Sequence, residues 1–199
     1  SFPYFGARAD GSLLGMFHRN LIVTDADLAS ERRKGAGEDG APISLRGRDL
    51  RYARLDRSVL SRADLTSANL DGASLAGADL RDARIGCADV TQLLLTDNRE
   101  EARCPTARGA NFIRANLSGA SMAGIDLRGA RLDEALLEGA DLSASILADA
   151  NLSGAHLEKA NLSGSVQAQG ANFLVATLQG ADLTGAQLQL ADLTSAAMQ

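Results

Sequence analysis

The feature that most constrains the fold is a five-residue period. In ANLSGAHLEKANLSG, residues 150–164, a leucine recurs at every fifth position and an alanine precedes each leucine by two. An α-helix turns by about 100° per residue and a flat strand alternates its faces at every residue, so neither gathers residues five apart on one side. The period therefore belongs to a larger object that is built from many copies of one short unit.

The period runs through three tracts of the sequence. If the large apolar residue is taken as the centre of each unit, centres recur every five residues over 45–90, 112–162 and 173–198. The residue two before the centre is usually Ala, and the residue between them is often Asp or Asn, which gives the consensus A-(D/N)-L-x-x. Hydrophobic residues make up 45% of the chain but aromatic residues only 4%. This composition fits a core built from one repeated Ala–Leu pair.

The tandem A-(D/N)-L-x-x units over residues 43–199 resemble the pentapeptide-repeat proteins. The resemblance implies an all-β fold, a right-handed quadrilateral parallel β-helix in which four units close each coil. In such a coil every centre and the Ala before it point inward, and successive coils stack about 4.8 Å apart. We expect about seven coils. The motif encodes a scaffold, so it implies a fold without implying a particular activity.

The repeats also predict the domain organisation. Residues 1–42 do not repeat and are interpreted as an N-terminal cap or linker, because a solenoid needs its first coil covered. Residues 43–199 form the predicted β-helix, interrupted by a surface loop at 91–109 and a one-residue bulge near 166–170. Repeats resume after each interruption with Gly-Ala-Asn-Phe, so Phe112 and Phe173 are expected to add core volume beside distorted coils.

The two cysteines, Cys87 and Cys104, flank the first interruption. A disulfide between them would close the loop. With only two cysteines and no recognisable secretory signal, we favour reduced thiols and a cytoplasmic protein, or a membrane-associated parent protein. No apolar run in the sequence approaches the roughly 18 residues that a membrane span needs.

The sequence offers no constellation of catalytic residues. His18 and His156 have no second histidine or cysteine at metal-ligand spacing, and the repeated serines have no accompanying base. No glycine pattern is typical of a phosphate-binding loop. We therefore predict no enzymatic activity, no cofactor and no metal site.

Function is then expected to reside on the surface of the β-helix. Residues 110–199 carry 4 basic and 9 acidic groups, which account for the net charge of −5. The residues assigned to a candidate acidic partner patch are Asp133, Glu134, Glu138, Asp141 and Glu158. Ile146 and Val166 occupy normally polar, outward positions one coil apart and form a candidate apolar partner patch.

These features favour a non-catalytic structural or protein-interaction scaffold with an unknown protein partner. One alternative comes from the resemblance, since some pentapeptide-repeat proteins mimic duplex DNA, bind DNA gyrase and confer fluoroquinolone resistance. Another alternative is the soluble repeat domain of a larger membrane-associated protein. The net charge excludes a strong basic footprint, so no direct binding of nucleic acid is expected. Exposed backbone edges at the ends of the rod suggest end-to-end homodimers.

Overall fold

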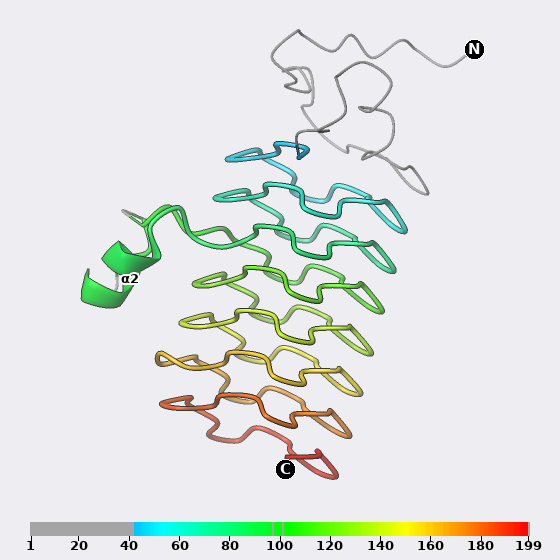
Figure 1. Ribbon diagram of the computed structural model, residues 1–199, viewed down its shortest axis with the longest axis vertical. Coiled ribbons are helices and arrows are strands. Elements are labelled where there is room, and N and C mark those ends of the chain that lie inside the picture. Colours follow the sequence, from blue (N-terminus) through cyan, green and yellow to red (C-terminus); the bar gives the residue numbers. More distant parts are fainter. Residues whose placement is uncertain (1–41, 97, 101, 199) are drawn as a thin grey trace, which may run out of the picture.

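The computed structural model describes residues 42–96, 98–100 and 102–198 (Figure 1). The chain winds into coils that stack along the long axis of the molecule, with the first described residues at one end and the C-terminus at the other (Figure 1). The predicted cap or linker over residues 1–42 lies outside the described residues, except for Pro42.

Parallel β-bridges connect each coil to the next. In the regular parts of the chain each bridge joins residues 20 apart, as in Ser44↔Asp64 and Asp64↔Arg84. The bridged residues are those directly before the centres, and they fall into four columns, here called faces A to D.

Each face holds seven bridged residues, which corresponds to seven coils. Face A consists of Ser44, Asp64, Arg84, Ser121, Asp141, Asn161 and Asp182. Face B consists of Asp49, Asn69, Thr106, Asp126, Ile146, Gln167 and Gln187. Face C consists of Arg54, Ser74, Asn111, Arg131, Asn151, Asn172 and Asp192. Face D consists of Val59, Asp79, Asn116, Leu136, His156, Thr177 and Ala197.

A tight turn at each corner lets the chain pass from one face to the next. The amide of Ala53 donates to the carbonyl of Leu50 at 3.0 Å, and Tyr52 between them has a φ of 60°. This i→i+3 hydrogen bond, with a positive φ at the third residue, is the geometry of a type II turn. The bridged Asp or Asn supports the turn, because its side chain accepts from the amide two residues later, as Asp64 does from Thr66 at 3.0 Å.

The inside of the coils is a continuous apolar core. The Ala and the centre of each unit point inward as the consensus predicts, and Ala130 and Leu132 are both fully buried. Pairing a small with a large side chain in each unit suits the close packing that a protein core needs. We call the stacked coils, residues 42–85 and 106–198, the rod.

The first interruption is longer than one turn and carries its own secondary structure. Bridges across it join residues 37 apart, as in Asn69↔Thr106, instead of 20. The additional residues lie within 86–105, here called the insertion, which contains helix α2 (Val90–Thr96) and projects from the side of the rod (Figure 1).

Two details of the predicted loop at 91–109 were wrong. Val90, expected to be the last centre of its tract, instead starts α2 and packs into a small cluster with Cys87, Leu93 and Ala102. Ala107, expected in the loop, is a fully buried centre of the next unit. The error has a physical origin, since a valine resembles a centre by size while an alanine does not.

The second interruption adds one residue. Bridges across it join residues 21 apart, as in Ile146↔Gln167. Gly164 and Ser165 both have a positive φ, of 71° and 65°, so the additional residue is accommodated at this corner, just before the predicted bulge near 166–170.

The shift at Ser165 overturns the candidate apolar partner patch. Val166 takes the inward place normally held by Ala and is 0% exposed, and Ile146 is only 6% exposed. A slip of one residue exchanges inward and outward positions, which is why Val166 was assigned to the wrong side. These two residues offer no apolar surface to a partner.

Candidate interaction surfaces

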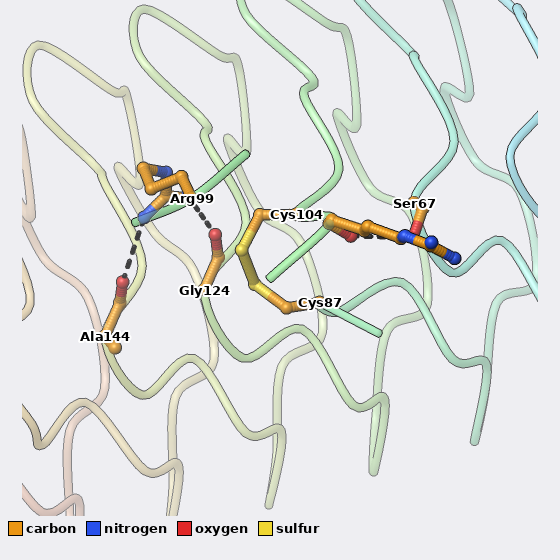
Figure 2. Close-up of a disulfide and its surroundings, with 7 residues drawn as sticks. Ser67, Cys87, Arg99, Cys104, Gly124 and Ala144 are labelled. Atoms are coloured by element: carbon orange, nitrogen blue, oxygen red, sulfur yellow. Dashed lines mark hydrogen bonds between the residues drawn. A yellow bond between two sulfur atoms is a disulfide. The ribbon is translucent and has the colours of Figure 1, made fainter. Parts of the chain in front are cut away.

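The insertion is attached to the corner between faces A and B. Cys87 and Cys104 form a disulfide with an S–S distance of 2.01 Å, so the expectation of reduced thiols is wrong in this structure and the alternative of a closed loop holds. Figure 2 shows the disulfide beside the corner residues Gly124 and Ala144. The bond joins the two ends of the insertion where the chain leaves and rejoins the rod.

Hydrogen bonds add to this attachment on both sides of the disulfide. The guanidinium of Arg99 donates to the carbonyl of Gly124 and, at 3.5 Å, to that of Ala144, which lies one coil further (Figure 2). The hydroxyl of Ser67 donates to the carbonyl of Arg103 at 2.6 Å. The insertion therefore contacts several successive coils at one corner.

Gly124 is the residue that allows this close approach. A Cβ at its position would overlap the Cys87 sulfur and lie 2.5 Å from Cδ2 of Leu93. Its φ of 72° is also in the left-handed region that favours glycine. In the sequence Gly124 looks like any other corner glycine, so its contact with the insertion could not be predicted.

Helix α2 also exposes apolar side chains that sequence reasoning missed. Leu94 is 59% exposed and Leu95 is 77% exposed, while the adjacent Leu93 is buried against the corner. Their signal in the sequence was the run Leu93-Leu94-Leu95, which breaks the five-residue period inside a segment predicted to be a loop.

The candidate acidic partner patch is spread over three faces. Asp133 and Glu134 follow a centre on face C, Glu138 and Glu158 follow centres on face D, and Asp141 is a bridged residue of face A. The structure therefore places Glu138 and Glu158 on one face in adjacent coils, and separates Asp141 from them.

Most of these carboxylates have partners. Glu134 forms a two-pronged ion pair with Arg114 at 2.8 and 3.1 Å, and this pair holds the pKa of Glu134 below its ordinary value. Glu138 lies 3.5 Å from the ammonium of Lys159.

Two more of the five carboxylates are bound by asparagine side chains. Asp133 accepts from the Asn151 amide at 2.5 Å, and Asp141 accepts from the Asn161 amide at 3.0 Å. The negative electrostatic potential at the patch is therefore weaker than five free carboxylates would produce.

Face D has a shallow depression of about 230 Å³ beside these residues. Its lining residues are Ser118, Leu136, Glu138, His156 and Glu158. Nδ1 of His156 lies 3.5 Å from a Glu158 oxygen, and the Thr177 hydroxyl donates to the same oxygen at 2.8 Å. Partial burial would raise the pKa of Glu158, but the hydrogen bonds from Thr177 and His156 outweigh it and lower that pKa.

A buried ion cluster on face B was missed altogether. Asp126 is 1% exposed and accepts from Arg128 at 2.6 Å and from Arg108 at 2.8 Å. Burial would raise the pKa of Asp126, but the two guanidinium groups hold it below its ordinary value. Thr106 and Ile146 are the neighbours of Asp126 in its column, so the cluster lies where the chain rejoins the rod after the insertion.

The described part of the chain contains no group of three His, Cys, Asp or Glu side chains arranged to hold a metal ion. None of its helices is long and apolar enough to cross a membrane.

The chain was compared with known proteins. No curated protein matches it. Among solved structures it is similar to HetL from the cyanobacterium Nostoc, a pentapeptide repeat protein involved in heterocyst differentiation regulation, with 26% identity over 91% of this chain and 90% of HetL and a TM-score of 0.35.

Two other solved structures were also found. A pentapeptide repeat protein from the Arabidopsis thaliana thylakoid lumen is 29% identical over 75% of this chain and 77% of its own, with a TM-score of 0.39. QnrB1, a plasmid-mediated fluoroquinolone resistance protein, is 13% identical over 91% of this chain and 94% of its own, with a TM-score of 0.43.

The match to a protein family is more decisive than these likenesses. The family model described as pentapeptide repeats matches the chain in 8 copies, over residues 44–82, 58–92, 106–133, 135–166 and 165–195. These matches span most of the rod and leave out the greater part of the insertion. The chain therefore belongs to the pentapeptide-repeat family.

Proposed function

We propose that this chain is a non-catalytic protein-interaction scaffold, a right-handed quadrilateral β-helix of seven coils that binds a protein partner through its side faces. The observation that supports it is the set of 24 parallel bridges between described residues, which holds outward side chains at regular positions on four faces. Such a rod offers long, flat and rigid surfaces on which a partner can bind without ordering the scaffold first.

Face D is the surface that we propose for the partner. The depression combines an apolar side chain, Leu136, with the carboxylates of Glu138 and Glu158. Apolar contact at the centre and charge at the rim are typical of protein interfaces. The carboxylates suit a partner segment that carries lysine or arginine next to an apolar residue.

A DNA mimic that binds DNA gyrase is a weaker alternative. Duplex DNA presents closely spaced, uncompensated negative charge. In this chain Glu134 and Glu138 are paired with Arg114 and Lys159. The first coil also carries basic side chains, namely Arg46, Arg48, Arg51, Arg54, Arg57 and Arg62. These charges do not reproduce the surface of a nucleic acid.

The proposal is tested by photo-crosslinking from position 118, at the edge of the depression, in extracts of the cells that make the protein. A protein captured there is then titrated against the purified chain. The charge-reversal variant Glu138→Lys/Glu158→Lys should weaken its binding at least tenfold, because it reverses both carboxylates of the depression.

The matched control is Glu100→Lys/Asp149→Lys, which makes the same change in net charge at an exposed place of the insertion and at a corner between faces B and C. Lysine is tolerated at such corners, since Lys159 occupies the equivalent place with a φ of 57°. The control should bind as the natural chain does. Equal binding by both variants, or no saturable binding by either, would refute the assignment of face D.

A further inference from the structure

We propose that the Cys87–Cys104 disulfide holds the insertion against the rod, and that a dithiol reductant releases the insertion while the rod stays folded. This inference does not depend on the proposed function of face D, which lies on another side of the coils. It would make the insertion a redox-controlled element of the scaffold.

Among its described residues, the insertion packs against the rod through a small apolar cluster. Its buried apolar residues form a cluster of Cys87, Leu93 and Ala102, with Ala144 of the rod packed against it. This cluster is separate from the rod's continuous core. So small a cluster provides little of the burial that keeps a segment of this length ordered.

Hydrogen bonds also join the described residues of the insertion to the rod, including one from the Asp126 amide to the Pro105 carbonyl at 3.2 Å. They also include the two from Arg99 to the carbonyls of Gly124 and Ala144, the one from Ser67 to Arg103, and the one from the Cys87 amide to the Ala123 carbonyl at 2.9 Å. The disulfide closes a loop with a sequence separation of 17. Cross-links of this loop length favour the ordered state substantially.

The rod does not need the insertion to keep its pairing. The coils before and after the insertion are bridged directly, through Asn69↔Thr106 and Arg84↔Ser121. The core residues on either side, Ile85 and Ala107, are fully buried within the rod. Opening the insertion would therefore be a local event that leaves the stacked coils intact.

The release is a thiol–disulfide exchange. A thiolate of the dithiol attacks Sγ of Cys104 and forms a mixed disulfide, and Sγ of Cys87 leaves as a thiolate that takes up a proton. The second thiolate of the dithiol then attacks the mixed disulfide and frees Cys104. The dithiol ends as its own disulfide, and both protein cysteines end as thiols. Attack at Cys104 is favoured because Cys104 is partly exposed, whereas Cys87 is 8% exposed.

Release would change the surface of the protein. In the closed state Leu93 is buried while Leu94 and Leu95 face solvent. Without the cross-link, α2 can move away from Gly124 and Ala144, which presents three consecutive leucines at once. Reduction would therefore increase the apolar surface that the insertion exposes to solvent.

The test is hydrogen exchange followed by mass spectrometry on the full chain, oxidised and after treatment with dithiothreitol. The reporters within the insertion are the amides of Ala88, Asp89, Ala102 and Cys104, all of which donate backbone hydrogen bonds. Reduction should speed their exchange on the order of a hundredfold. The rod amides of Leu117 and Leu132 should change less than about twofold, since they donate to neighbouring coils.

The double variant Cys87→Ser/Cys104→Ser should behave like the reduced protein under oxidising conditions. The control variant Arg99→Ala, with the disulfide intact, should retain most of the protection. The proposal would be overturned by unchanged exchange in the insertion after complete reduction, by equal loss of protection in the rod, or by release in oxidised Arg99→Ala. Two free thiols in the purified protein after treatment with diamide would overturn it as well.

A second measurement tests the direction of attack. Oxidised protein is treated with glutathione, quenched with acid and digested, and the modified cysteine is identified by mass. Glutathione on Cys104 is the expected result. Glutathione mainly on Cys87 would contradict the proposed order of exchange.

Discussion

The two interruptions of the rod occur at the same corner and differ in almost everything else. Both follow a centre of face A, Ile85 or Leu162, and precede a unit on face B. The first adds a helix, a disulfide and a buried cluster, whereas the second adds the single residue Ser165. Pairing between the flanking coils continues across both. The corner thus accommodates added segments of very different lengths when the next bridged residue returns to its column.

Both interruptions change the side chains that pack in the core of the rod. Each is followed by a small centre, Ala107 or Ala168, and the next centre in the same coil is a phenylalanine, Phe112 or Phe173. The phenylalanines are fully buried and are the largest side chains of the core. We interpret each Ala–Phe succession as a redistribution of volume within one coil, since a cavity beside the alanine would be destabilising.

The largest expected effect comes from breaking this compensation. Phe112→Ala and Phe173→Ala should each lower the free energy of unfolding by about 3–5 kcal/mol, because each leaves a cavity next to an alanine. Restoring the consensus with Ala107→Leu/Phe112→Leu should lose less, about 1–3 kcal/mol, since it keeps the number of side-chain carbon atoms in the coil and adds only a modest volume. Urea unfolding measures all three. If the double variant Ala107→Leu/Phe112→Leu were as unstable as Phe112→Ala, the side chains at positions 107 and 112 would not fill one common space in the core.

The next effect separates the corner beneath the insertion from an open corner. Gly124→Ala should lower the free energy of unfolding by about 2–4 kcal/mol, because it adds overlap with Cys87 and Leu93 to the strain of a positive φ. Gly129→Ala is the matched control. Its φ is 63° and no atom lies within 4 Å of the added Cβ, so it should lose only about 1 kcal/mol.

Thermal unfolding of the two variants, with the disulfide intact and after reduction, checks this difference. Reduction should bring the unfolding temperatures of Gly124→Ala and Gly129→Ala closer together, since the released insertion no longer crowds position 124. Equal losses in the oxidised proteins would show that the insertion does not press on this corner.

Low pH should weaken one of the two places where the chain rejoins the rod and leave the other unchanged. After the insertion, Thr106 pairs with Asp126, which is bound by Arg108 and Arg128, whereas after Ser165 the pairing is between Ile146 and Gln167. The pKa of Asp126 is lowered in the folded state, so its contribution is present above the unfolded pKa of about 3.9 and is lost as the pH falls through the folded pKa.

Asp126→Asn should therefore lower the free energy of unfolding by about 1–2 kcal/mol at pH 7. The difference from the natural chain should shrink steadily below about pH 4, as the natural carboxyl takes up its proton. Denaturant titrations between pH 2.5 and 7 provide the measurement, with Gln167→Ala as the control at the second junction. A difference that is constant over this range would mean that the ionised carboxylate contributes nothing.

The sequence predicted the regular parts of this molecule better than the junctions. The inward positions of Ala and Leu follow directly from the five-residue period. The Arg114–Glu134 ion pair follows as well, because these residues are 20 apart and so lie one above the other in adjacent coils. Val90 was wrongly predicted to be a centre and Ala107 was not, because the prediction identified centres by side-chain size alone. Val166 was placed outward because the added residue at Ser165 came before the predicted bulge, and one residue reverses a side chain. The disulfide depends on how the insertion packs, which no local pattern encodes.

The smallest expected effect comes from removing the shorter interruption. Deletion of Ser165 leaves Val166 inward, Ala168 as the centre and a spacing of 20 between Ile146 and Gln167, as elsewhere in the rod. The free energy of unfolding should change by less than about 1 kcal/mol, since the core keeps its side chains and a residue with a positive φ is lost. Deletion of Asp149, which holds a corner place in a unit of normal length, is the contrasting variant. It shortens the spacing between the centres Leu147 and Leu152 from five residues to four. Pairing on one side must therefore slip, and the outer coils should unfold at much lower urea. Comparable losses from both deletions would mean that the corner at Ser165 is as specifically built as the others, and that tolerance of added length is not a property of this corner.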